Sequence, residues 1–156
     1  MTLPAPSQTI GPFFAEAMSW LGPGHGDVVV RGTVFDGDGV PVSDAVVEAW
    51  HGGPDGQFAP GSFSRAISDD DGCYVLVTSR PGAVDEVQAP HMDVSIFARG
   101  LLQRLVTRLY MADAADPVLD GLEPARRATL VAQPDGDGYR FDIHLQGDRE
   151  TVFFAW

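Results

Sequence analysis

The sequence contains no lysine, and all ten of its basic residues are arginines, set against 22 acidic residues. The resulting formal net charge of −12 repels nucleic acids and anionic membranes at long range, which argues against both as ligands. An anionic small molecule would therefore have to be met by a specific arginine, because the general field around the protein is repulsive.

Cysteine is almost absent as well. The single residue, Cys73, excludes an internal disulfide and leaves too few thiols for a zinc cluster, so we expect it to pack as a small buried residue. No apolar stretch approaches the roughly 18 to 20 residues that a bilayer crossing needs, and no basic segment precedes an apolar one at the start. These absences predict a cytoplasmic protein. Motifs of serine hydrolases and phosphate-binding loops are also missing.

Glycine and proline are plentiful, at 18 and 12 residues, and Asp-Gly pairs recur between short apolar stretches in the manner of hairpin turns. Apolar and polar residues alternate in seven segments, which predicts an all-β domain of seven or eight short strands, a sandwich or a barrel. The segments are 27–35, 45–50, 73–78, 91–99, 104–111, 129–132 and 139–146.

Two stretches depart from this alternation. Residues 1–26 contain Pro4, Pro6, Gly11 and Pro12, which cannot form regular ladders, and only 13–21 could form a short helix. We expect an N-terminal arm over 1–26 that leads into one domain over 27–156. Residues 112–125 are interrupted by prolines and predict a loop or a helical turn.

Three acidic Asp-Gly clusters, at 36–39, 69–72 and 135–138, superficially resemble calcium-binding loops. They are flanked by predicted strands and lack the glutamate that closes a calcium loop of the helix-loop-helix type. Ordinary β-turns are the favoured interpretation.

A metal triad is the sharpest hypothesis that the residues alone support. Alternate residues of a strand share a face, so His91, Asp93, Ser95 and Arg99 should point away from a core that contains Met92, Val94, Ile96 and Ala98. Together with the distant His144, the His91-x-Asp93 pair imitates the facial triad of iron(II) oxygenases. His144 itself lies on the face of Arg140 and Asp142, opposite Phe141 and Ile143, which predicts an outer face. A solitary iron(II) oxygenase is therefore one alternative.

Four longer segments occur together in a characteristic order. They are PSQTIGPFF at 6–14, VVVRGTVFDGDGVPVSDAVVEAWH at 28–51, PHMDVSIFARGLLQRLVTRLYM at 90–111 and YRFDIHLQGDRETVFFAW at 139–156. Over nearly the whole chain they resemble the intradiol ring-cleavage dioxygenases, and within that family the alpha chains of its heteromeric members. The resemblance implies a β-sandwich of about eight short strands, with an irregular N-terminal arm and a short helix.

The resemblance also implies a non-haem iron(III) that two tyrosines and two histidines hold, but only on the beta chain of a heteromer. In this chain Val84 stands at the place of the first tyrosine, and Asp93 stands where the second histidine of an H-x-H pair would be. His91 matches the first histidine, and only residues 85–90 remain where the second tyrosine would lie. The resemblance therefore implies no metal and no catalytic residue on this chain alone, with the iron held by the beta partner.

Such an alpha chain would instead shape the substrate cavity of its partner. The matching positions are Thr9, Gly11, Pro12 and Phe13 in the arm, where alpha chains often have tyrosine in place of Phe13, and Arg99 in the FARG segment. The expected reaction is cleavage of protocatechuate by O₂ to 3-carboxy-cis,cis-muconate in a higher hetero-oligomer of alpha and beta chains. One guanidinium could orient the substrate carboxylate.

Two simpler interpretations stay open. Arg99 could form only a surface or interface salt bridge, and the arm could only pad a subunit contact. Residues 28–81 also resemble prealbumin-like modules, which would make the chain a non-enzymatic binding domain. That likeness covers only a third of the chain and leaves the FARG segment and the C-terminal segment unexplained.

Overall fold

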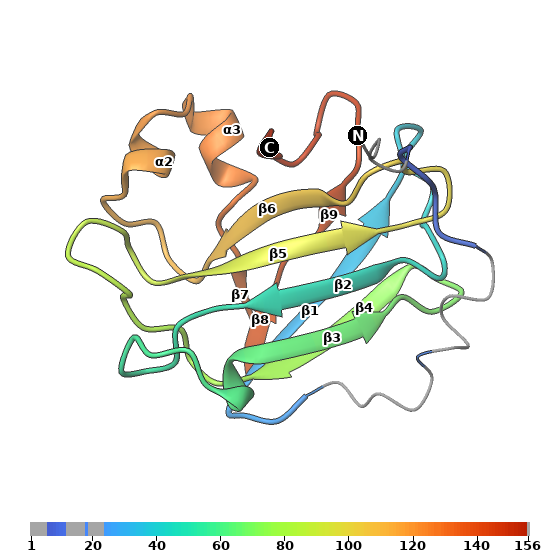
Figure 1. Cartoon of the computed structure of the whole chain (residues 1–156). Helices are drawn as coiled ribbons and strands as arrows, with labels where there is room; N and C mark the ends of the chain where they lie inside the picture. The colour runs from blue at the N-terminus through green and yellow to red at the C-terminus, as the bar shows by residue number, and fades with distance from the viewer. Residues whose placement is uncertain (1–5, 12–17, 19–23, 156) are drawn as a thin grey trace, which may run out of the picture.

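The computed structural model describes residues 6–11, 18 and 24–155, which fold into two β-sheets packed face to face (Figure 1). The first sheet has the strand order β4 (Cys73–Thr78), β1 (Val28–Phe35), β8 (Gly138–Arg140) and β7 (Gln133–Asp135), and β9 (Ile143–His144) also pairs with β1. The second sheet has the order β3 (Phe63–Ile67), β2 (Val46–Trp50), β5 (His91–Phe97) and β6 (Leu105–Tyr110). The predicted all-β sandwich is confirmed.

The core lies between the two sheets, and the alternation of β5 shows how the sequence directs it there. Met92, Val94 and Ile96 are at most 1% exposed, whereas Asp93 between them is exposed. The same alternation buries Val30 of β1 and Leu76 of β4 from the opposite sheet. The predicted inward and outward faces of the 91–99 segment are therefore confirmed.

The Asp-Gly clusters form tight turns. The carboxylate of Asp36 accepts hydrogen bonds from the backbone N–H groups of Asp38 and Val40, and the carboxylate of Asp69 accepts from those of Asp71 and Cys73. These aspartates are thus occupied by the backbone of their own turns, which confirms the β-turn interpretation.

Several sequence predictions were wrong in detail. No strand covers 129–132, because Thr129 ends a helix and only Val131 makes an isolated bridge, to Tyr110. The expected strand over 139–146 is divided into β8 and β9, and β3 and β7 were missed. Cys73 is exposed, since on β4 it lies on the face opposite the buried Tyr74 and Leu76. The predicted helix over 13–21 falls almost entirely outside the described residues.

Among the described residues, helical structure is confined to short turns. A 3-10 turn, η1 (Pro60–Ser62), precedes β3, and the irregular stretch after β6 contains α2 (Pro117–Asp120) and α3 (Pro124–Ala128), as the prolines predicted. No helix in the described ranges has the length and apolar character that a membrane crossing requires. The turns cover a second apolar cluster of Ala89, Tyr110, Leu119, Leu130 and Val152 at one end of β6.

Asp116 connects this second cluster to the sheet. Its carboxylate, in a residue that is only 2% exposed, accepts hydrogen bonds from the N–H groups of Val118 and Ala89 and from the hydroxyl of Tyr110. Burial opposes ionisation of this carboxyl, but the hydrogen bonds outweigh burial and hold its pKa below the usual value.

We predict that Asp116→Ala lowers the free energy of unfolding by about 2 to 3 kcal/mol, because it removes the cap of α2 and leaves three buried donors without an acceptor. The depressed pKa means that this contribution is present above the ordinary carboxyl pKa of about 4 and is lost as the pH falls through the lower folded-state value. Denaturant titrations at neutral and acidic pH measure both effects.

The matched control is Asp70→Ala, at an exposed turn position, which should change stability by less than about 0.5 kcal/mol. An Asp116 variant as stable as the Asp70 variant at neutral pH would contradict the structural role of this carboxylate.

Candidate functional site

The end of β5 brings together two of the residues that the sequence predicted for the site. Arg99 follows the strand, and the N–H of the next residue, Gly100, donates a hydrogen bond of 2.8 Å to Oγ1 of Thr9 in the arm. Gly100 has φ of 90°, which is in the region that favours glycine, so the FARG turn can present its amide to the arm without strain. The described part of the arm is thereby fixed beside Arg99.

Arg99 is held by a partner that the sequence did not reveal. Its Nε lies 2.9 Å from Oδ2 of Asp44, while the side chain stays 55% exposed. Because the side chain stays half-exposed beside this contact, the guanidinium remains accessible to a second anion. Arg99 therefore forms the salt bridge that one interpretation predicted. Its exposed guanidinium can still bind a second anion.

The backbone of Asp44 is fixed in an uncommon conformation. Its φ of 61° makes it the sole non-glycine residue with positive φ in the described ranges. The backbone of Ser68 accepts a hydrogen bond from the N–H of Asp44, and the hydroxyl of Ser68 accepts one from the N–H of Ala45. The carboxylate that anchors Arg99 is consequently part of a rigid loop.

The carboxylate of Asp44 is also incompletely satisfied. Its Oδ1 is buried and has no hydrogen-bond partner in the described part of the chain, which is unfavourable for a carboxylate oxygen. Strained backbone and unpartnered polar atoms are typical of functional sites, where geometry is retained at the expense of stability. In the sequence, the only signal for the special role of Asp44 is that aspartate tolerates positive φ better than most residues do.

The other arm residues are less defined. Gly11 is exposed and has open space around its Cα, while Pro12 and Phe13 lie outside the described residues. The proposed cavity roles of Gly11, Pro12 and Phe13 stay predictions.

His91 and Asp93, which the resemblance matches to iron-ligand positions, lie on the outer face of the second sheet. His91 is buried, its Nδ1 lies 2.7 Å from the carbonyl oxygen of Ala89, and its Nε2 lies 3.6 Å from Oδ1 of Asp93. Arg108 of β6 stands directly opposite Asp93 and places Nε 3.4 Å from the same oxygen. His91 is therefore a hydrogen-bonded structural residue.

This arrangement does not fit a metal centre. The Arg108 guanidinium pairs with the Asp93 carboxylate, which would otherwise be the group that binds a metal cation. Val84, 41% exposed, has no atom that can bind a metal. Burial lowers the pKa of Arg108, but the hydrogen bond with Tyr110 and the charges of Asp93 and Asp116 outweigh burial and raise it. The positive charge of Arg108 is therefore stabilised. Burial raises the pKa of Tyr110 to about 12, so its hydroxyl stays protonated at neutral pH.

The alternative triad is wrong. His91 and Asp93 belong to β5 of the second sheet, whereas His144 belongs to β9, which pairs with β1 in the first sheet. The His144 ring stacks on Phe35 with 4.8 Å between ring centroids. No group of three metal-ligating side chains occurs among the residues that the structure describes.

Comparison with known proteins agrees with the fold. A family model described as Dioxygenase matches residues 16–147. The dioxygenase domain of a carbohydrate-binding fusion protein from Streptomyces sp. SirexAA-E superposes with a TM-score of 0.60 at 23% identity and covers 92% of this chain and 99% of that chain. This chain therefore belongs to the intradiol ring-cleavage dioxygenases.

Within this family, the chain is similar to protocatechuate 3,4-dioxygenase alpha chains. It is 37% identical to the one from Burkholderia cepacia, over 96% of this chain and 95% of that one. It is 41% identical to the one from Pseudomonas putida, over 81% and 75%. The protocatechuate 3,4-dioxygenase beta chain from Burkholderia cepacia is 30% identical, over 80% of this chain and 66% of that one.

We predict that Asp44→Gly is more stable than Asp44→Ala by about 1 kcal/mol, because glycine adopts positive φ freely and alanine does not. Both variants lack the carboxylate, so their difference isolates the backbone conformation. Denaturant titration of the two proteins measures it.

The same pair of substitutions at Ser43, where φ is not positive, should give the opposite order, with alanine the more stable. Equal stability of Asp44→Gly and Asp44→Ala would contradict the strained backbone.

Proposed function

We propose that this chain is the alpha subunit of a heteromeric protocatechuate 3,4-dioxygenase and binds no iron itself. The observation that carries the proposal is the Asp93–Arg108 ion pair, which occupies the position of the family's metal ligands on the outer face of β5. The similarity to two alpha chains over most of their lengths supports the same role. Ring cleavage would take place at the iron of the beta chain, and no step of it would use a metal on this chain.

Substrate positioning is the contribution that the described residues can make. Protocatechuate carries one carboxylate, and Arg99 offers a half-exposed guanidinium whose orientation is fixed by Asp44. Holding the substrate in one orientation removes rotational freedom before the chemical step, which can be worth large factors when the geometry is tight. The hydrogen bond from Gly100 to Thr9 would keep the arm next to this arginine.

Asp44 would act in this site as a positioning residue. Its rigid carboxylate holds Nε of Arg99, so it aims the guanidinium without touching the substrate. Retention of a buried, unpartnered Oδ1 and a positive φ at this position is understandable if the geometry of Arg99 matters more than local stability.

The surface of the second sheet has a feature that favours binding of a partner protein. Trp50 and Phe58 are 44% and 57% exposed and stack with 5.8 Å between ring centroids, beside the face that carries Asp93. Large exposed aromatic side chains that lie together are typical of contact surfaces between proteins. We assign this surface to the beta chain, in a higher hetero-oligomer of alpha and beta chains.

The proposal is tested by producing the chain together with its beta chain and measuring O₂ uptake. The complex should cleave protocatechuate, and the alpha chain alone should not. We expect Arg99→Ala to leave the iron content of the complex unchanged and to raise KM for protocatechuate by about tenfold or more, the size of a charge-assisted contact.

Two comparisons sharpen this experiment. Arg80→Ala, at an exposed arginine elsewhere, should leave both constants unchanged, and catechol, which lacks the carboxylate, should not distinguish Arg99→Ala from the native complex. Asp44→Asn should also raise KM for protocatechuate, but by less than Arg99→Ala does. An unchanged kcat and KM in Arg99→Ala would remove this arginine from the site.

A further inference from the structure

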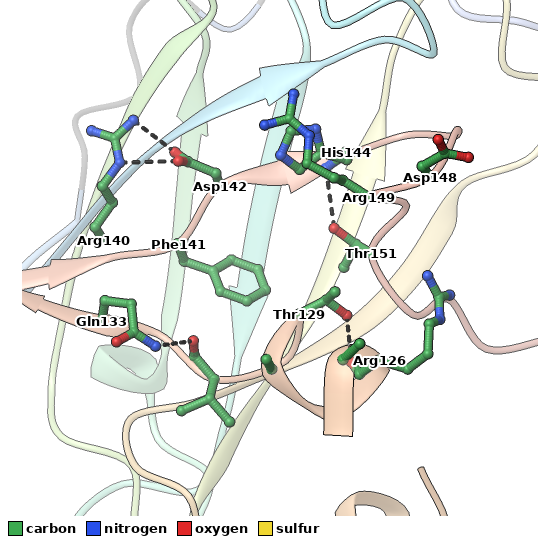
Figure 2. A pocket seen from close by; sticks show the side chains of 13 residues that line it. Arg126, Thr129, Gln133, Arg140, Phe141, Asp142, His144, Asp148, Arg149 and Thr151 are labelled. Atoms are coloured by element: carbon green, nitrogen blue, oxygen red, sulfur yellow. Dashed lines mark hydrogen bonds and ion pairs between the residues drawn. The ribbon is translucent and has the colours of Figure 1, made fainter. Parts of the chain in front are cut away.

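A hollow with a volume of about 420 Å³ lies far along the chain from Arg99 and Asp44, among the C-terminal elements. It is lined by residues of α3 and β8, by His144 of β9 and by the segment 148–151 (Figure 2). This volume is within the range of roughly 300 to 1,000 Å³ that is usual for small-molecule sites. None of the residues assigned above to the substrate cavity contributes to it.

Three arginines from separate segments gather around this hollow. Figure 2 shows Arg126 of α3, Arg140 of β8 and Arg149 of the segment 148–151 on different sides of it, around Phe141 and two threonines. They are three of the ten cations in a chain whose net charge is −12. Asp142 and Asp148 also line the hollow, so three arginines stand against two aspartates and the lining is formally positive, in contrast to the net negative charge of the chain.

Two of the arginines are held in place, and the third has unused capacity. Asp142 binds Arg140 through both carboxylate oxygens, at 3.0 and 2.9 Å, and the carbonyl oxygen of Glu150 accepts a hydrogen bond from Arg126. Arg149 is exposed and makes no ion pair with a carboxylate in the part of the chain that the structure describes. Its guanidinium is therefore free to bind a ligand.

A buried hydroxyl adds a second donor. Thr151 is 1% exposed, and its Oγ1 accepts a hydrogen bond of 3.0 Å from the N–H of His144. Its hydroxyl hydrogen has no acceptor within the described ranges, unlike that of Thr129, which is donated to the carbonyl oxygen of Arg126 at 2.7 Å. A buried donor without an acceptor is unfavourable, and an oxygen of a ligand in the hollow would satisfy it.

The rest of the lining is part polar, with Gln133, His144 and Asp148, and part apolar. Phe141, Val131, Ala125 and Ala128 line the hollow between the charged groups. Burial and the neighbouring Arg149 lower the pKa of His144, which keeps its stacked ring neutral at neutral pH. The hollow thus combines convergent donors with an apolar surface, which suits a ligand that has one anionic end and a flat apolar body.

We propose that this hollow is a second binding site, which takes a small aromatic carboxylate. The carboxylate binds Arg149 and the Thr151 hydroxyl, and the ring packs against Phe141 and the alanines of α3. Arg149, which has no carboxylate partner among the described residues, sets the preference for an anionic group, and the apolar side chains favour an organic ligand over an inorganic anion. This site goes beyond the proposed function and does not depend on it, because it shares no residue with the Arg99 site.

The test is binding of 4-fluorobenzoate to the full chain, followed by fluorine NMR and by calorimetry. Arg149→Ala should weaken binding by about tenfold or more, and Arg149→Glu should abolish it. The matched control is Arg80→Ala, because Arg80 is also exposed and lacks a carboxylate partner in the described part of the chain; it should bind like the native protein. Thermal unfolding of Arg149→Ala should be unchanged, since Arg149 makes no ion pair with any residue that the structure describes.

Two further probes separate charge from shape. The neutral analogue 4-fluorobenzamide and the small anion acetate should each bind about tenfold or more weakly than 4-fluorobenzoate. Equal binding by the Arg149 and Arg80 variants, or equal binding of the amide and the acid, would overturn the proposal. Arg99→Ala should bind the probe normally, so failure of the second site and failure of the proposed function give different results.

Loss of 4-fluorobenzoate binding when the chain joins its beta chain would also overturn the proposal, because the hollow would then be part of a subunit contact. Binding that persists in the complex and still depends on Arg149 would support it.

Discussion

The pairing of β5 between β2 and β6 is the constraint on which the rest of the structure depends. Its inward residues Met92, Val94 and Ile96 fill the core, which fixes the register of the strand. A slip by one residue would bury Asp93 and expose those three side chains. The same register places His91 and Asp93 on the outer face and brings Arg99 to the end of the strand, next to Asp44. One packing requirement thus determines both the Asp93–Arg108 pair on the outer face and the position of Arg99.

The outer face of β5 and the end of β5 at Arg99 differ in how completely their charged side chains are paired. On the outer face, Asp93 is paired with Arg108, and Tyr110 and Asp116 extend the network into the second apolar cluster. These four side chains form ion pairs or hydrogen bonds with one another, so this part of the face has a structural role. At the end of β5, Arg99 is engaged on one side only, and its anchor Asp44 is strained and incompletely satisfied. Arg99 can therefore bind a further group, whereas Asp93 is already paired within the chain.

Most of the fold could be predicted from the sequence, because β1, β2, β4, β5 and β6 have clear alternation of apolar and polar residues. The segment 129–132 has the same pattern but ends a helix, since Pro124 starts α3 and the apolar residues Leu130 and Ala132 pack as they leave it. β7 was missed because its three residues are all exposed and include a proline. Alternation records only burial, so strands without a buried face leave no signal.

The site was predictable only where a residue type or a family pattern marks it. Arg99 and Thr9 were named through the resemblance, and the Gly100 hydrogen bond shows that they lie near each other, while their part in a site stays a prediction. The ion pair with Asp44 was not predictable, because it joins residues 55 positions apart through a backbone conformation that the sequence does not specify. The hollow around Arg149 likewise arises from three segments that become neighbours only in the folded chain.

The central claim is that this chain shares an active site without holding iron, and the iron content of the purified alpha-beta complex tests it most directly. Metal analysis against protein concentration, with each subunit quantified separately, gives the stoichiometry. The account predicts one iron per alpha-beta pair, unchanged when Asp93 or His91 of this chain is replaced by alanine. Two irons per pair, or loss of iron on replacement of His91, would contradict it.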